Sequence, residues 1–172
     1  VHHGDVVSVD RLADAVFEGE PTEAARTTMR SYIARIRKVI ASGAPDVELV
    51  TRAPGYGLMG PRAGVDVHRF EALLNEGRRQ LGAGDAALAA VTLRQALDVW
   101  RGDAYAEFAH EEWVIPEAQR LEELRVLAVE RLVESELACG RSAESIALLE
   151  TLVAEHPLRE GFRSQLMLAL YR

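Results

Sequence analysis

The chain has 172 residues, of which 48% are hydrophobic and 27% are charged, and its formal net charge is −7. This composition is typical of a soluble globular protein with one domain or two small ones. No apolar run approaches the roughly 20 residues that span a bilayer. The one cysteine, Cys139, excludes an intramolecular disulfide and fits a reducing compartment, so we expect a cytoplasmic protein that does not enter a membrane.

The negative charge is distributed unevenly along the chain. Residues 1–60 carry seven Lys/Arg and eight Asp/Glu, a net charge of −1, whereas residues 61–172 carry 13 and 19, a net charge of −6. A polyanion would repel the second part. We therefore expect that part to face away from nucleic acid or to meet another protein.

Two helices separated by a short loop are predicted near the start. Residues 1–7 show no clear pattern, and Ser8 then provides an N-cap for a short amphipathic helix over residues 8–17. Gly19 and Pro21 break this helix, and a second helix covers residues 22–40. Two helices joined by a short loop form the outline of a helix-turn-helix.

The second helix is amphipathic and basic. Its apolar residues Met29, Ile33, Ile36 and Ile40 recur at helical spacing, and residues 22–40 carry five Arg/Lys against one Glu. The opposite side mixes short polar residues with long cations, which suits base edges and phosphates in a DNA groove. The alternative is an ordinary solvated amphipathic helix. Residues on or beside the opposite side are Thr27, Thr28, Arg30, Ser31, Ala34, Arg35, Arg37 and Lys38.

A β-hairpin is predicted directly after the basic helix. Residues 47–52 are rich in β-formers, Pro54 and Gly55 provide a turn, and residues 56–59 return the chain. A hairpin in this position is typical of a wing. Arg52 would lie at its tip, where it could reach a phosphate or the minor groove, although it could also be an ordinary exposed strand residue.

The remainder of the chain predicts helices. Residues 61–64 form a Gly/Pro linker, and helices follow over about 66–82, from Asp85 to about Trp100, and over 113–139, 142–156 and 158–172. Asp66 and Asp85 are expected as N-caps and Gly140 as the residue that ends a helix. Residues 101–112 have no clear period. Leu132 and Leu166 lie 34 residues apart, the period of a tetratricopeptide repeat. The large apolar side chains are interpreted as core: Phe70, Trp100, Leu121, Leu124 and Phe162.

Several segments resemble a known family. The segments VDRLADAVF, ARTTMRSYIARIRKVI and LVTRAPGYGL resemble the second helix, recognition helix and wing of an OmpR-type winged-helix domain, most closely that of the actinobacterial antibiotic regulatory protein (SARP) family. VDVHRFEALL, LRQALDVWRG, RLEELRVLAVERL and LVAEHPLREGFRSQLMLALYR resemble the bacterial transcriptional activator domain of that family. The resemblance covers nearly the whole chain.

The resemblance implies a mainly α protein with two domains. Residues 1–60 would be a winged helix-turn-helix with a β-hairpin wing that lacks the family's N-terminal sheet and first helix, residues 61–64 a linker, and residues 65–172 a tetratricopeptide-like activator domain that is incomplete at its C-terminus. Without the missing helix and sheet, the apolar stripe at Met29, Ile33 and Ile36 would be exposed.

The corresponding function is sequence-specific DNA binding by a transcriptional activator. Thr27, Thr28, Ser31 and Arg35 would read bases, whereas Arg30, Arg37, Lys38 and Arg52 would hold phosphates of double-stranded DNA. The resemblance implies direct-repeat sites, contact with the sigma or alpha subunit of RNA polymerase, and a homodimer on DNA. The polymerase candidates are in the loop between the helices: Glu18, Glu20 and Glu23.

The alternative function is a protein-binding adaptor in which the tetratricopeptide-like part is active and the basic helix is incidental. No motif argues for catalysis, because the chain has no nucleophile elbow, no phosphate-binding glycine loop and no cysteine cluster. Of the five histidines, only His2 and His3 are close in sequence, and no zinc-protease pattern is present. We therefore predict no catalytic residue, no metal site and no cofactor.

Overall fold

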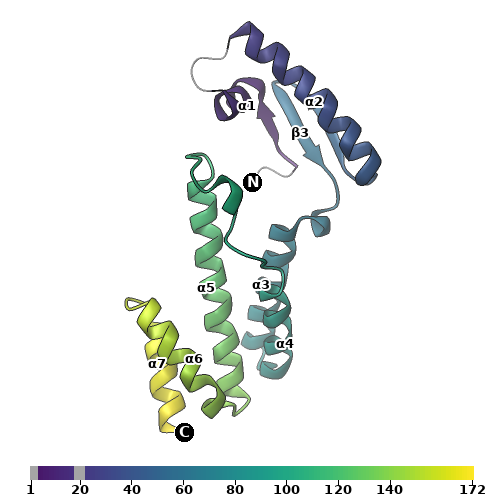
Figure 1. Cartoon of the computed structure of the whole chain (residues 1–172). Coiled ribbons are helices and arrows are strands. Elements are labelled where there is room, and N and C mark those ends of the chain that lie inside the picture. Colours follow the sequence, from purple (N-terminus) through teal and green to yellow (C-terminus); the bar gives the residue numbers. More distant parts are fainter. Residues whose placement is uncertain (1–3, 18–21) are drawn as a thin grey trace. The chain divides into compact units, whose positions relative to one another are not determined.

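The computed structural model describes residues 4–17 and 22–172, which divide into two compact units, Val1–Val65 and Asp66–Arg172. Helices dominate both units, and the first also contains a small antiparallel sheet (Figure 1). The predicted mainly α fold with a β-hairpin after the basic helix is therefore confirmed.

The two helices of the first unit begin at side-chain caps. Helix α1 (Val9–Val16) starts after Ser8, whose hydroxyl accepts from the Arg11 amide at 3.2 Å, and α2 (Glu23–Gly43) starts after Thr22, which caps Ala25 in the same way. Helix α2 continues almost one turn past the predicted end at Ile40. It stops at Ala44, because a residue followed by proline disfavours helical geometry.

The sheet of the first unit has three strands rather than a lone hairpin. Strands β2 (Glu48–Arg52) and β3 (Gly55–Met59) form the predicted hairpin, and β1 (Val6–Ser8) pairs antiparallel with β3, in the order β1-β3-β2. A run of only three residues is too short to show an alternating pattern, so the sequence did not indicate β1. A Cβ at Gly55 would lie 2.7 Å from Ser8 Cα, so glycine allows β1 to approach β3.

The apolar stripe of α2 is buried only in its first half. Met29 and Ile33 are 4% and 7% exposed, whereas Ile36 is 46% exposed. The expected exposure of the stripe is thus wrong for Met29 and Ile33 and right for Ile36. The helix packs against α1 and β2, and the buried Ala13 of α1 is small enough to let another helix come close.

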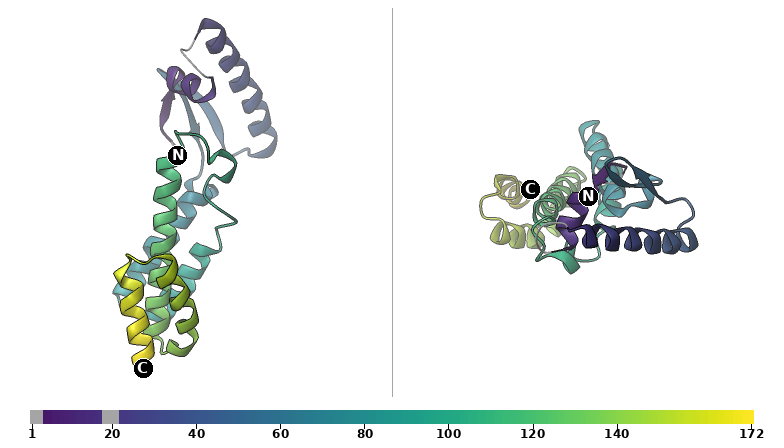
Figure 2. Two further views of the ribbon diagram at one scale, coloured as in Figure 1. Left: turned by 60° about the vertical axis from the view of Figure 1, so that its left-hand side comes forward. Right: turned by 90° about the horizontal axis from the view of Figure 1, so that it is seen from above.

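The second unit contains five α-helices arranged mainly as hairpin pairs: α3 (Asp66–Gly82), α4 (Ala86–Leu97), α5 (Ile115–Ala138), α6 (Ser142–Glu155) and α7 (Glu160–Tyr171). Helices α3 and α4 pack together, as do α6 and α7, and the long α5 contacts both pairs (Figures 1 and 2). A 3-10 turn at Ala106–Phe108 lies between α4 and α5 in the sequence, and another, at Arg62–Gly64 in the first unit, precedes α3. Within residues 4–17 and 22–172, no helix is both long and apolar enough to cross a membrane.

The helix ends of the second unit agree with the sequence in part. Gly140 adopts φ 82° after α5, and the Arg141 amide donates to the Glu136 carbonyl at 3.0 Å, which is the expected glycine-terminated helix end. Asp66 is the first residue of α3 and accepts from the adjacent Val67 amide at 2.8 Å. Asp85 is at the expected N-cap position, directly before α4, and its carbonyl accepts from the Ala89 amide at 2.9 Å, but its carboxylate accepts no cap hydrogen bond.

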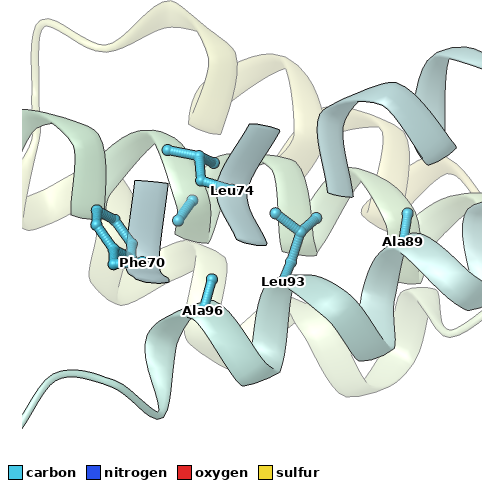
Figure 3. Packing of buried hydrophobic residues seen from close by; sticks show 6 residues of the cluster. Phe70, Leu74, Ala89, Leu93 and Ala96 are labelled. Atoms are coloured by element: carbon cyan, nitrogen blue, oxygen red, sulfur yellow. The ribbon is translucent and has the colours of Figure 1, made fainter. Parts of the chain in front are cut away.

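Two apolar clusters stabilise the second unit. The first lies between α3, α4 and α5 and includes Phe70, Leu74 and Leu93 (Figure 3). A Cβ at Gly77 would lie 2.6 Å from Leu93 Cγ, so glycine lets α3 and α4 approach closely there. The second cluster joins α5, α6 and α7 around Phe162, which is fully buried. The prediction of core roles is confirmed for all five large side chains: Phe70, Trp100, Leu121, Leu124 and Phe162.

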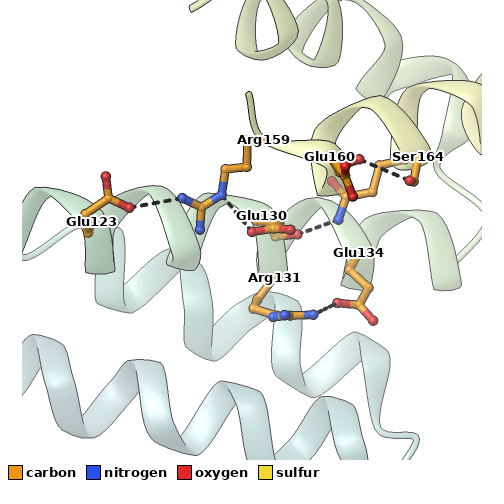
Figure 4. A network of polar contacts seen from close by, with 8 residues as sticks. Glu123, Glu130, Arg131, Glu134, Arg159, Glu160 and Ser164 are labelled. Carbon is orange, nitrogen blue, oxygen red and sulfur yellow. Dashed lines mark hydrogen bonds and ion pairs between the residues drawn. The ribbon is translucent and has the colours of Figure 1, made fainter. Parts of the chain in front are cut away.

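Ion pairs also hold α7 against α5. The Arg159 guanidinium donates to Glu130 at 2.9 Å and to Glu123 at 3.2 Å, and both carboxylates belong to α5 (Figure 4). Gln165 of α7 donates to the Glu130 backbone carbonyl at 2.9 Å. Two glutamates of α5 thus share one arginine partner within the same unit.

Candidate nucleic-acid interface

The outer side of α2 is a polar, cationic surface. Thr27, Ser31, Arg35 and Lys38 are exposed on it, and Thr28 is half-buried at its edge. Arg30 is also exposed, with 65% of its side chain accessible. These side chains lie on the surface of a single helix, opposite the buried Met29 and Ile33. A helix of this kind can enter the major groove without any rearrangement of its core.

The cations of this surface differ in how far they are engaged. Arg35 and Lys38 have no hydrogen-bond or ion-pair partner among residues 4–17 and 22–172. Arg30 lies 4.0 Å from the Glu23 carboxylate, at the limit of an ion pair between exposed groups, which contributes little to stability. All three remain able to approach a phosphate or a base edge.

The hydroxyl groups on this surface are held by the helix itself. Thr28 donates to the Ala24 carbonyl at 3.0 Å, and Ser31 donates to the Thr27 carbonyl at 3.3 Å. Each oxygen keeps lone pairs that can accept a hydrogen bond, so these residues are suited to the amino groups of adenine or cytosine.

Arg52 lies at the tip of the hairpin. It is the last residue of β2, opposite Gly55 in the register, and its side chain is exposed. No hydrogen bond or ion pair involves it in the part of the chain that the structure describes. Arg52 is therefore a second cationic site of the first unit, in addition to the outer side of α2.

Arg37 is placed differently from the other predicted phosphate ligands. Its guanidinium reaches from α2 to the hairpin, where Nε donates to the Leu49 carbonyl at 2.7 Å and Nη2 donates to Thr51 Oγ1 at 2.6 Å. Its Cζ also lies 5.9 Å from the centre of the Tyr56 ring. The sequence analysis did not identify Thr51 or Tyr56. Their positions, directly opposite each other across β2 and β3, could have suggested a shared contact.

The polymerase candidates are only partly visible. Glu18 and Glu20 lie outside the described residues. Glu23 opens α2, is exposed, and pairs with Arg26 at 3.7 Å. Arg26 also donates to Asp10 of α1 at 3.0 Å, and this hydrogen bond raises the pKa of the Arg26 guanidinium. Arg26 thereby joins the two helices of the helix-turn-helix.

The described residues contain no group of three or more His, Cys, Asp or Glu side chains arranged to hold a metal ion. What the first unit offers instead is charge and hydrogen-bonding groups on rigid elements. Such a surface can bind a polyanion.

Comparison with protein families identifies the second unit. Residues 65–172 match the family model described as "Bacterial transcriptional activator domain". The chain is 38% identical to regulatory protein DnrI of Streptomyces peucetius over 177 residues, which cover 98% of the chain and 65% of that protein. It is also 38% identical to transcriptional regulatory protein EmbR of Mycobacterium tuberculosis, with 96% of the chain and 43% of that protein covered.

A solved structure shares the fold. The structure of Mycobacterium tuberculosis EmbR in complex with a low-affinity phosphopeptide has a TM-score of 0.92 and 36% identity, and it covers 99% of the chain and 46% of that protein. The chain thus spans less than two thirds of the length of these relatives. With the activator-domain match and these relatives, the chain belongs to the SARP family of transcriptional regulators, which carry a bacterial transcriptional activator domain.

Proposed function

We propose that this regulator is a sequence-specific DNA-binding activator that places α2 in the major groove of direct-repeat promoter sites. The observation that carries the proposal is the outer side of α2, where Arg35 and Lys38 are exposed and have no partner among the described residues. A cation without an intramolecular partner loses no existing interaction when it meets a phosphate or a guanine.

The residues divide into two roles. Thr27, Thr28, Ser31 and Arg35 read base edges, because a guanidinium can donate two hydrogen bonds to guanine and the hydroxyl groups can accept from amino groups. The long cations neutralise phosphates, with Arg30 and Lys38 acting from α2 and Arg52 from the hairpin tip. Arg37, the fourth predicted phosphate ligand, instead donates hydrogen bonds to the hairpin.

Activation requires a contact with the transcription machinery. Our candidate is RNA polymerase, through its sigma or alpha subunit, and the candidate contacts are the residues Glu18, Glu20 and Glu23 and the acidic helical unit. Residues 61–172 carry a net charge of −6, which supports a role for this part of the chain in binding a protein, since an acidic surface is repelled by DNA. Binding as a homodimer on the two copies of a direct repeat completes the proposal.

Selection of bound sequences from a random duplex pool, using the intact chain, tests the proposal directly. We expect enrichment of a repeated motif, and the affinity for that motif should fall steeply with salt because counterions are released from the phosphates. Binding that is equally weak for every duplex at every salt concentration would contradict DNA recognition by α2.

A protein-binding adaptor is the second candidate, favoured by the acidity of the helical unit and by a cavity of about 330 Å³ in it. The start of α3 and the loop after α4 form this cavity, which Phe70, Trp100 and Tyr105 line with aromatic rings. Such a hollow can accept an apolar side chain of a bound peptide. Retention of polymerase subunits by the chain, together with no salt-dependent retention of labelled duplex, would favour the adaptor.

A further inference from the structure

One side chain links the recognition helix to the wing. Among the described residues, all side-chain hydrogen bonds between α2 and the β2–β3 hairpin come from Arg37, which binds the Leu49 carbonyl and the Thr51 hydroxyl. Strand β2 lies at the edge of the sheet, so the contact is made where the hairpin has no further strand to hold it. The guanidinium also lies near the Tyr56 ring of β3 and so contacts both strands.

We propose that Arg37 is a positioning residue that fixes the hairpin against α2, so that Arg52 at the tip meets the duplex in register with the base-reading side of the helix. This inference rests on the proposed DNA-binding function and assigns Arg37 a different role from the phosphate ligand expected from the sequence. Arg52 immediately follows Thr51 in β2. A change in how Thr51 is held therefore moves the tip directly.

The geometry separates positioning from phosphate binding. The two donors, Nε and Nη2, engage two different acceptors of β2 at 2.7 and 2.6 Å, which requires the planar fork of arginine. Lysine carries the same charge on a single ammonium group and cannot reproduce that fork. A phosphate ligand should tolerate Arg37→Lys, whereas a positioning residue should not.

The first experiment needs no DNA. Hydrogen–deuterium exchange of the intact chain is measured for the hairpin amides, residues 48–59, in the parent, Arg37→Lys and Thr51→Val. We expect about fivefold to tenfold faster exchange at the hairpin in both variants, because each loses part of the contact that holds β2. The matched control is Arg30→Lys on the same helix, whose side chain contacts only Glu23 at 4.0 Å among the described residues and should leave the hairpin unchanged.

The second experiment measures affinity for the selected duplex. Arg37→Lys should weaken binding about tenfold, and Thr51→Val should reproduce part of that loss. The control for affinity is Arg79→Lys, at an exposed arginine of the second unit that pairs with Glu76, and it should stay within about twofold of the parent. In an Arg52→Ala background, Arg37→Lys should have little further effect, because the group that it positions has been removed. If Arg37 contacted a phosphate directly, the losses of affinity caused by Arg37→Lys and by Arg52→Ala would instead multiply in the double variant.

The outcomes are distinct. Parent-like affinity and parent-like hairpin exchange in Arg37→Lys would overturn the inference, and so would independent effects of Arg37→Lys and Arg52→Ala. A parent chain that binds no duplex overturns the proposed function and, with it, the role of Arg37 in DNA binding. In that case faster hairpin exchange in Arg37→Lys would identify a contact that stabilises the fold alone. Thermal unfolding of each variant confirms that the chain remains folded.

Discussion

The arginines of the two units have different partners. In the first unit, Arg35 and Arg52 are exposed and have no partner among the described residues. In the second unit, seven arginines form ion pairs with glutamates of the same unit: Arg79, Arg94, Arg120, Arg125, Arg131, Arg141 and Arg159. Most of the arginines with ion pairs among the described residues therefore lie in the second unit, whereas Arg35 and Arg52 of the first unit remain available for an external anion.

The units also differ in the side chains that form their cores. The second unit buries Phe70 and Phe162 almost completely, within two clusters that connect all five helices. Among the described residues of the first unit, the buried hydrophobic side chains are Ala13, Met29 and Ile33. Substitutions in the second unit should thus act mainly on stability, and substitutions on the outer side of α2 should act mainly on binding.

The largest effect is expected for Phe162→Ala. Phe162 is fully buried between α5, α6 and α7, and loss of a buried phenyl ring removes apolar contacts and leaves a cavity. We expect the free energy of unfolding of the second unit to fall by about 3–5 kcal/mol, as measured by urea denaturation followed by circular dichroism. Met167→Ala is the control on the same helix, because Met167 is 65% exposed and its loss should change stability by less than about 0.5 kcal/mol. Similar costs for the two variants would show that α7 does not pack as described.

A smaller loss of stability is expected for Gly77→Ala. The added methyl group would lie 2.6 Å from Leu93 Cγ, so α3 and α4 must separate or Leu93 must change conformation. Overpacking of this kind costs about 1–3 kcal/mol, again measured by urea denaturation. Gly82→Ala in the same helix is the control, since no atom lies within 4 Å of the added Cβ. Gly82→Ala should be neutral or slightly stabilising, and a parent-like Gly77→Ala would contradict the close approach of the two helices.

Sequence patterns anticipated the helices better than the contacts between elements. Helix α2 was recognisable from its apolar period and its cationic side, because these signals lie within one segment. Strand β1 has only three residues and depends on pairing with β3, some 50 residues later in the chain. Local pattern carries no information on such a partner, so the strand was missed.

The candidate site shows the same limit. Exposure of Thr27, Ser31, Arg35 and Lys38 follows from their angular positions on the helix opposite Met29 and Ile33. The hydrogen bonds from Arg37 to β2 do not follow from its position on the helix, since that position also permits a free side chain. What decides its role is the approach of β2, and that approach is a property of the tertiary structure.

For binding, we predict the larger effect at Arg35. Arg35→Ala should weaken binding to the selected duplex by about 1–3 kcal/mol and relax the preference for one base pair, because the bidentate contact to a base edge is lost. Titration of two duplexes that differ at that base pair measures both effects. Urea denaturation should give a parent-like free energy of unfolding, since the Arg35 side chain is exposed and has no partner among the described residues. Parent-like affinity of Arg35→Ala for the selected duplex would exclude a base-reading role.

The smallest effect on DNA affinity is expected for Arg52→Ala, and this effect should be the same for every duplex. Loss of one phosphate contact should weaken binding to all duplexes alike and reduce the slope of log K against log salt by about 1, because one fewer counterion is released. Affinity titrations of two sequences at several salt concentrations measure this slope. Arg79→Ala is the matched control, since Arg79 is an exposed arginine of the second unit and pairs with Glu76. If removal of Arg79 changed the slope as much as removal of Arg52, the acidic unit would itself contact DNA, and the two units would not divide stability and binding between them.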